Sequence, residues 1–396
     1  MLLPPLVLAG CLGGSSGGSR PVRGSDLTIY SSLPMHGVGA GAARAVLAGQ
    51  RLALGHAAGR VGRYRVRLVP LDAARPGGGP WDPGRTSANA SRATDDPTAI
   101  AYLGELGYGA SAVSVPITNS AGLLELSPGD GLASLTRTPP GELQRGGPIR
   151  YYPRAGRTFL RLVPDDVRVA AALLDLDESE RARRIAVLTD DGNYGEELGR
   201  TTVALAARRG KVVVGDDDFN GNPSSVSGLA RKIAERRPDA IVHAGVVAPG
   251  TPSLLEALER ALPGVPVVGS GGLSPDAPQS PASPGRRVVV LSPFRASTSY
   301  PARGRRLLRA LPASARRPEA LYGYESMRLV LDAIRAREAE GKRPTRAGVV
   351  RAALAPRRRR GAIGDYRIER SGDVSAPGFA EYRPRAGRLV FERLVR

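Results

Sequence analysis

Two adjacent carboxylates and a tyrosine, Asp190, Asp191 and Tyr194, follow directly on the apolar run Ile185–Leu188. Such a run is typical of a strand buried on both faces of a parallel sheet, and a helical period follows it. Ligands of open α/β sheets lie beyond the carboxyl ends of the strands, so this loop should border a ligand crevice. The two carboxylates could act as a paired acid and base, but adjacent acids after a strand are more typical of a turn and helix cap.

Other sequence motifs that occur in enzymes are present, but they do not stand at the strand and helix positions that their catalytic roles require. Gly37–Ala42 fits the dinucleotide pattern G-x-G-x-x-A, but Leu33–His36 separates it from the preceding strand. The pattern G-x-S-x-G occurs only within Gly13–Gly18, not at a strand-to-helix elbow. The three histidines are far apart and show no zinc-ligand spacing. We therefore predict a non-enzymatic protein with no metal and no cofactor, with a secreted Rossmann-type oxidoreductase as the enzymatic alternative.

The formal net charge of +20 invites a nucleic-acid interpretation, which the distribution of the charge disfavours. Only three of the 57 basic residues are lysines, and the arginines are spread along the chain. The densest run, Arg357–Arg360, has no interleaved aromatic residues for base stacking. We predict a solvated, arginine-rich surface that attracts anionic surfaces, including membranes, and no nucleic-acid partner.

The N-terminus resembles a lipoprotein signal. Leu2–Leu8 is apolar but far shorter than the ~20 residues that span a bilayer. The sequence Leu-Ala-Gly-Cys that ends at Cys11, the only cysteine, resembles a bacterial lipobox, although no Lys or Arg precedes the apolar run. We predict a signal peptide over 1–11, lipidation of Cys11, a Gly/Ser tether over 12–25, and an extracytoplasmic location on the outer face of the membrane.

Two series of alternating strand and helix patterns divide the chain, whose 396 residues are too many for one core. The predicted strands are 27–31, 64–71, 99–103, 123–126, 185–188, 211–215, 240–243, 266–269, 288–291, 364–368, 378–383 and 389–394. The longest predicted helix is 318–337. This pattern predicts an α/β protein with two lobes, mostly parallel central sheets and a cleft between the lobes.

The loops that follow the predicted strands are the candidates for lining that cleft: 33–37, 108–111, 127–131, 190–194, 245–248 and 269–272. They offer hydroxyl groups, backbone N–H groups at helix starts, and two tyrosines, Tyr108 and Tyr194. These groups suit a small polar or anionic ligand, and they offer no reaction machinery.

Five segments, in this order and spacing, resemble the type I periplasmic solute-binding proteins of the branched-chain amino acid class, the receptors of ABC importers. The segments are LPMHGVGAGAARAVLAGQRLAL, AYLGELGYGASAVSVPITNSAGLLELSP, IAVLTDDGNYGEELG, ALYGYESMRLVLDAI and IGDYRIERSGD. The resemblance covers about residues 27–394, and many members of the family are tethered lipoproteins, which fits the lipobox.

The resemblance implies two Rossmann-like lobes joined by three chain crossings, with closure by hinge motion on a ligand between them. Lobe 1 would comprise 26–158 plus 294–372, and lobe 2 would comprise 159–293 plus 373–396. It implies a monomer that binds a small solute (an amino acid, amide or carboxylate-like compound) and delivers it to ABC permease subunits. The alternative within the binding class is a ligand-sensing receptor lipoprotein.

The resemblance also places a candidate site. In amino-acid-binding members a serine-bearing loop holds the ligand carboxylate together with an N–H group and a hydroxyl after Ser-Pro. Ser111 or Ala110 matches the first element. Gly129 and Gly131 match the second without the hydroxyl, and Tyr194 matches the tyrosine that lines the cleft.

The ammonium side of the family's site is only partly matched. An aromatic residue is commonly present where this chain has Val246, and an acid usually stands where it has Gly271. Asp130 is a candidate replacement for that acid. Because a buried ammonium needs a paired charge, we expect leucine, isoleucine and valine to bind poorly and the ligand to be a small neutral or anionic solute.

Overall fold

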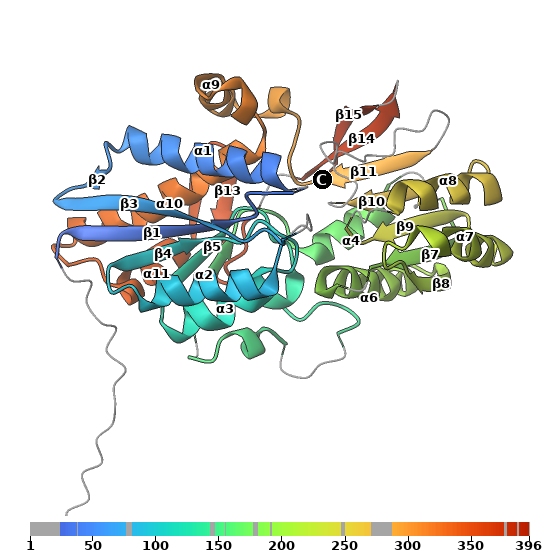
Figure 1. The fold of residues 1–396 in the computed structure, drawn as a ribbon, viewed down its shortest axis with the longest axis horizontal. Helices are drawn as coiled ribbons and strands as arrows, with labels where there is room; N and C mark the ends of the chain where they lie inside the picture. Colours follow the sequence, from blue (N-terminus) through green and yellow to red (C-terminus); the bar gives the residue numbers. More distant parts are fainter. Residues whose placement is uncertain are drawn as a thin grey trace, which may run out of the picture.

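Two sheets, each flanked by helices, form two lobes that lie side by side in the computed structural model (Figure 1). The chain passes between the sheets three times: after β6 (Phe159–Arg161), after β11 (Val288–Ser292) and after β13 (Gly364–Ile368). The structure describes residues 24–37, 39–76, 81–142, 147–154, 156–176, 181–190, 192–246, 250–270, 287–375, 378–385 and 388–395. This architecture confirms the predicted α/β class with two lobes of mostly parallel strands.

The sheet of lobe 1 has the strand order β2-β3-β1-β4-β5-β6 and is parallel except for the short edge strand β2. Its strands are β1 Asp26–Leu33, β2 Arg60–Val61, β3 Tyr64–Asp72, β4 Ala99–Leu103, β5 Leu124–Ser127 and β6 Phe159–Arg161. Its helices are α1 Ala40–His56, α2 Pro83–Asp95, α3 Ser111–Ser120, α9 Ala302–Ala310, α10 Glu319–Ala339 and α11 Arg346–Leu354. The short turns η1 Ala133–Leu135, η2 Gly147–Tyr151, η5 Ser297–Ser299 and η6 Ala313–Ala315 complete the lobe.

Helices α1 and α10 pack backbone against backbone on one face of this sheet. A Cβ atom on Gly49 would lie 1.9 Å from the carbonyl oxygen of Ala320, and one on Gly323 would lie 2.0 Å from that of Val46. Neither position could carry a side chain without moving a helix apart from its neighbour. Glycine at these two positions therefore sets the distance between the longest helix of the lobe and α1.

The sheet of lobe 2 has the order β15-β14-β11-β10-β9-β7-β8, parallel except for the C-terminal hairpin of β14 and β15. Its strands are β7 Arg184–Thr189, β8 Val212–Asp218, β9 Ala240–Ala244, β10 Val267–Ser270, β11 Val288–Ser292, β14 Phe379–Arg385 and β15 Arg388–Val395. Its helices are α4 Asp166–Leu174, α6 Asn193–Arg208, α7 Val226–Glu235 and α8 Thr251–Ala261, with the turn η3 Pro223–Ser225. Strands β9 and β11 are buried along their whole length, as their apolar sequences require.

Strand β6 was not predicted from the sequence. It pairs in parallel with β5, so the first sheet extends to Arg161. The strand contains only Phe159, Leu160 and Arg161. A run of three residues that ends in an arginine is too short to show the alternation typical of a strand. The pairing with β5, and not the local sequence, therefore determines that these residues form a strand.

One arginine of the run 357–360 is an exception to the solvated, arginine-rich surface that the sequence predicts. Residues Arg357–Gly361 form strand β12, which pairs with β13, Gly364–Ile368. The Arg359 side chain is only 10% exposed and its guanidinium contacts Glu325 at 3.3 Å and Asp332 at 2.8 Å. Arg359 therefore pairs with two acids of α10, while Arg358 and Arg360 are exposed. Composition alone does not reveal this pairing.

A buried ion pair connects two of the three crossings between the lobes. The guanidinium of Arg161, at the end of β6, lies 2.8 Å from the Asp373 carboxylate beyond β13. Arg161 also donates to the carbonyl of Leu132 at 2.7 Å and to the Thr136 hydroxyl. Burial favours the neutral acid, but Arg161 and nearby hydroxyls outweigh it and hold the pKa of Asp373 below its usual value.

We predict that Asp373→Asn lowers the free energy of unfolding by about 3 kcal/mol, because it leaves a fully buried guanidinium without its counter-charge. Glu196→Gln, which removes one partner of a half-exposed pair with Arg200, should change it by less than about 0.5 kcal/mol. Urea unfolding at pH 7 measures both. Because the folded pKa is lowered, the contribution of Asp373 is fully present above about pH 4 and disappears as the pH falls further. Equal losses in the two variants would contradict this role of the pair.

Candidate functional site

The two sheets meet around a small cavity between the lobes. Its volume is about 20 Å³, which is enough for about one water molecule. It lies beside the loops that follow β4 and β5 in lobe 1, the start of α4 and α6, and the ends of β10 and β11. The lining residues are Tyr108, Gly129, Gly131, Val163, Pro164, Asp166, Val169, Tyr194, Ser270, Leu291, Pro293 and Phe379.

Two tyrosines close this cavity from opposite lobes. The ring centroids of Tyr108, from the loop after β4, and Tyr194, in the first turn of α6, are 4.7 Å apart. The Tyr194 hydroxyl lies 3.0 Å from the Ser270 hydroxyl at the end of β10. Burial raises the pKa of Tyr194 well above its usual value, so its hydroxyl stays protonated. A solute the size of an amino acid can enter only if these two rings move apart.

A polar contact between the lobes accompanies the ring contact. The backbone N–H of Ser134, in η1 of lobe 1, donates to the Glu197 carboxylate of α6 at 2.9 Å. Glu197 is 4% exposed, and burial raises its pKa although Ser134 partly counters this effect. The structure therefore represents a closed arrangement of the lobes, stabilised by an aromatic pair and a buried hydrogen bond.

The carboxylate of Asp166 lines the cavity and has fewer hydrogen-bond donors around it than it can accept. It stands in the first turn of α4, which packs against β10, β11 and α6 of lobe 2, and it is 2% exposed. Its Oδ2 atom is buried and accepts no hydrogen bond from any described residue. Burial, reinforced by the nearby carboxylate of Glu197, raises the pKa of Asp166 well above its usual value. An unpaired acid of this kind is strongly stabilised by a cation or hydrogen-bond donor placed beside it.

Asp130 occupies the anion cradle that the sequence assigned to a ligand. Its carboxylate accepts hydrogen bonds from the backbone N–H groups of Ser111 at 2.8 Å, Gly109 at 3.1 Å and Leu132 at 3.1 Å. Both carboxylate oxygens are therefore engaged, and the side chain is fully buried. Burial nevertheless raises its pKa, because desolvation outweighs the three donors. The N–H group at the start of α3 is held by the protein's own acid in this closed structure.

The loop after β5 is fixed in a similar way. The Ser127 hydroxyl accepts from the N–H groups of Gly129 at 3.1 Å and Asp130 at 2.7 Å, and donates to the carbonyl of Glu105 at 2.6 Å. Glu105 is itself bonded to the Tyr102 hydroxyl at 2.6 Å, and burial raises its pKa to about 8. A hydrogen-bonded polar layer beneath the cavity thus fixes the two loops that carry Tyr108 and Gly129.

Asp190 braces the loops of lobe 2. Its two carboxylate oxygens accept from the N–H groups of Gly192 at 2.8 Å and Val246 at 2.6 Å. A Cβ atom on Gly195 would lie 2.4 Å from the Asp190 carboxylate, so the start of α6 requires glycine here. These contacts favour the turn-and-cap interpretation of Asp190 over an acid–base pair.

The described part of the chain has no group of three or more His, Cys, Asp or Glu side chains placed to hold a metal ion. Among the helices of the same residues, none combines the length and the apolar character that a membrane span requires.

A family model described as periplasmic binding protein matches residues 28–373, most of the chain. The chain belongs to the periplasmic binding protein family. Its matched segment includes both lobes except the β14–β15 hairpin, and every described residue that lines the interlobe cavity except Phe379.

Solved structures with the same fold include solute-binding and amino-acid-binding proteins of several organisms. The leucine-binding protein LivK of Thermotoga maritima is 18% identical, with a TM-score of 0.75 over 93% of this chain and 98% of its own. The binding protein LivJ of Streptococcus pneumoniae, in complex with isoleucine, is 16% identical, with a TM-score of 0.70 over 93% and 100%. A solute-binding protein of R. palustris, in complex with benzoate, is 17% identical, with a TM-score of 0.71 over 93% and 96%. At these identities the likeness establishes the fold.

The structure of this periplasmic binding protein brings together part of the site expected from sequence. Tyr108, Gly129, Gly131 and Tyr194 line the cavity. Ala110, Ser111 and Asp130 lie buried behind its wall, while Val246 packs at the edge of the lobe 2 core. Gly271 and the lipidation candidate Cys11 lie outside the described residues.

Ser270 lies in the loop 269–272 that was expected at the cleft, whereas the cavity residues Asp166 and Phe379 were not expected there. The adjacent acids Asp165 and Asp166 could have indicated a functional carboxylate in the sequence, because a helix needs only one N-cap residue. Asp165 is that cap and accepts from the N–H of Arg168 at 3.0 Å, which leaves Asp166 for another role.

We predict that Tyr194→Ala weakens solute binding by about tenfold or more, because it removes a ring and a hydroxyl from the cavity wall. Tyr194→Phe keeps the ring contact with Tyr108 and loses only the bond to Ser270, so it should weaken binding less. Calorimetry with the solute found by a thermal-shift screen measures both. Wild-type affinity in Tyr194→Ala, with an unchanged melting temperature, would show that Tyr194 has no part in binding.

Proposed function

We propose that this chain is a non-enzymatic, extracytoplasmic substrate-binding protein of an ABC importer that binds a small solute in the interlobe cavity, with a protonated amine of the solute beside Asp166. The observation that supports the amine is that Asp166 lines the cavity and that its buried Oδ2 atom accepts no hydrogen bond from a described residue. Family membership and the two-lobed fold support the transport role.

The electrostatics of the cavity favour a cation over an anion. Asp130 and Asp166 both raise the pKa of Tyr108 through their negative charge, after burial itself. The guanidinium of Arg161 is engaged by Asp373, and the N–H donor of Ser111 is engaged by Asp130. The acids near the cavity thus outnumber the donors that have no partner there. A cationic group of a solute would be attracted to these acids, and a carboxylate of a solute would be repelled by them.

This proposal changes the ligand class expected from the sequence. That expectation rested on Val246 and Gly271, which lack an acid, and it did not include Asp166. The related structures show complexes with isoleucine, which has an ammonium group, and with benzoate, which does not. Asp166 favours the first kind of solute for this chain. Amino acids and other small amines are therefore the compounds to screen first.

We predict that Asp166→Asn weakens binding of an amine solute by about a hundredfold, on the scale of removing one partner from a buried charge pair. Glu196→Gln is the matched control: it removes a half-exposed carboxylate from the first turn of α6, the helix that carries Tyr194, and Glu196 does not line the cavity. We expect the control to stay within about threefold of the wild type. Equal affinities of wild type and Asp166→Asn would contradict the proposed contact.

The pH dependence follows from the raised pKa of Asp166. An ammonium group favours the ionised acid, so binding should release a proton wherever free Asp166 is protonated. Affinity should therefore increase as the pH rises towards the pKa of free Asp166 and then level off. Calorimetry in two buffers of different ionisation enthalpy detects the released proton, and Asp166→Asn should abolish it.

The proposed membrane anchor is the lipidated Cys11, with a monomeric binding domain on the outer face and ABC permease subunits as partners. A sensing role without transport is the alternative. We predict that Cys11→Ser moves the protein from the membrane fraction to the soluble fraction of a bacterial host. Lipid labelling of the wild type is the control, and retention of the variant in the membrane without any label on the wild type would contradict the anchor.

A further inference from the structure

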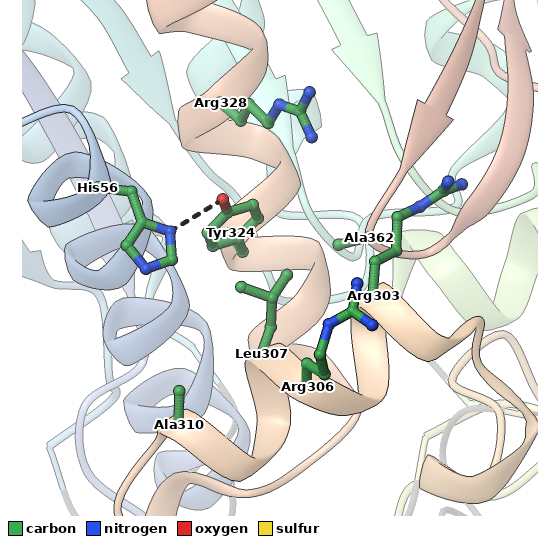
Figure 2. A pocket seen from close by; sticks show the side chains of 8 residues that line it. All are labelled: His56, Arg303, Arg306, Leu307, Ala310, Tyr324, Arg328 and Ala362. Carbon is green, nitrogen blue, oxygen red and sulfur yellow. Dashed lines mark hydrogen bonds between the residues drawn. The ribbon is translucent and has the colours of Figure 1, made fainter.

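A second recess lies on lobe 1, separate from the interlobe cavity and with none of its residues. It is an open groove of about 330 Å³ between α1, α9 and α10 (Figure 2). Its lining residues are His56, Arg303, Arg306, Leu307, Ala310, Tyr324, Arg328 and Ala362. We call these eight residues the basic groove.

The basic groove combines three guanidinium groups, and no carboxylate is among its lining residues. Arg306 is exposed and forms no ion pair with any residue that the structure describes. Arg328 is only loosely paired, at 3.9 Å from Asp332. Figure 2 shows the side chains of Arg303 and Arg306 rising from the same helix, α9, on one side of the groove. Three guanidinium groups that line one groove, one of them without an ion pair to a described residue, attract an anion with several oxygens.

One of these arginines is held in place before any ligand arrives. The Arg303 guanidinium donates to the carbonyl of Gly361 at 2.5 Å and to the Asp365 carboxylate at 2.6 Å. Helix α9 packs closely against the backbone of Ala362 at Gly304, where a Cβ atom would lie 2.4 Å from the carbonyl oxygen of Ala362. Because α9 cannot shift without breaking these contacts, Arg303 loses little freedom when it binds an anion.

On the opposite side of the groove, two polar side chains, His56 and Tyr324, hold each other in place. The Nδ1 atom of His56 lies 3.1 Å from the Tyr324 hydroxyl, and the two rings meet edge to face at 5.7 Å. Figure 2 shows this pair facing the α9 arginines across Leu307. A ligand between them would meet hydrogen-bonding groups from both sides and an apolar strip in the middle.

We propose that the basic groove binds a phosphate-bearing anion, either a soluble phosphate compound or the phosphate of an anionic phospholipid headgroup. Phosphate oxygens match the fork of the arginine guanidinium, and two or three arginines around one anion form the usual protein site for a multiply charged phosphate. The site is independent of solute binding in the interlobe cavity.

The first test is calorimetry of the full chain with inorganic pyrophosphate at low salt. We expect saturable binding that Arg306→Ala weakens by about tenfold or more, the scale of losing charge-assisted hydrogen bonds. Arg309→Ala removes the same charge from the same helix outside the groove, so it should weaken binding by less than about twofold. Equal losses in the two variants would show a diffuse charge effect and overturn the proposed site.

The second test separates the two sources of phosphate. The full chain with Cys11→Ser, which removes acylation, is sedimented with phosphatidylglycerol vesicles and with phosphatidylcholine vesicles. Binding to phosphatidylglycerol alone that Arg306→Ala weakens more than Arg309→Ala assigns the groove to a headgroup. Pyrophosphate binding without vesicle binding assigns it to a soluble phosphate. Absence of both kinds of binding, with all variants folded by thermal melting, overturns the proposal.

Discussion

The buried pair of Arg161 and Asp373 is the contact on which the arrangement of the lobes depends. Arg161 ends the last strand of the first sheet, and Asp373 stands where the chain leaves lobe 1 for the last time. The same arginine fixes the carbonyl of Leu132, in the segment that leads to η1. Gly372 completes the junction, since its φ of +90° and its approach to the Phe159 carbonyl oxygen leave no room for a side chain.

This junction determines where the cavity groups lie. Asp165 and Asp166 follow β6 within a few residues, and Asp165 is tied to Arg137 at 2.9 Å. The same Arg137 lies 3.7 Å from Asp373, so the start of α4 and two of the crossings share one set of charges. Asp166 is thereby held beside the cavity, where its Oδ2 atom accepts no hydrogen bond from a described residue. A protein that binds an amine by closing on it benefits from such an acid, because the solute supplies the missing partner only in the closed state.

Much of the fold was predictable from the sequence because its strands are apolar and buried on both faces. Strand β4 was predicted with the observed bounds, and the loops after β4, β5 and β7 were expected at the cleft. The sequence did not reveal β6 or β12, since their side chains are explained by partners far away in the chain, such as Glu325 for Arg359. It also could not show that Asp130 fills the anion cradle or that Asp166 is unpaired. Those properties depend on hydrogen bonds between loops that only the folded chain brings together.

The central claim is that a solute is enclosed by movement of the two lobes about this junction, and small-angle X-ray scattering tests it most directly. The lobes are closed around a cavity of about 20 Å³, so they must open to admit an amino acid or amine. We predict that the solute-stripped protein has a larger radius of gyration than the closed structure gives, and that a saturating amine solute reduces it. An unchanged scattering profile for the stripped and the saturated protein, with binding verified by calorimetry, would contradict the account.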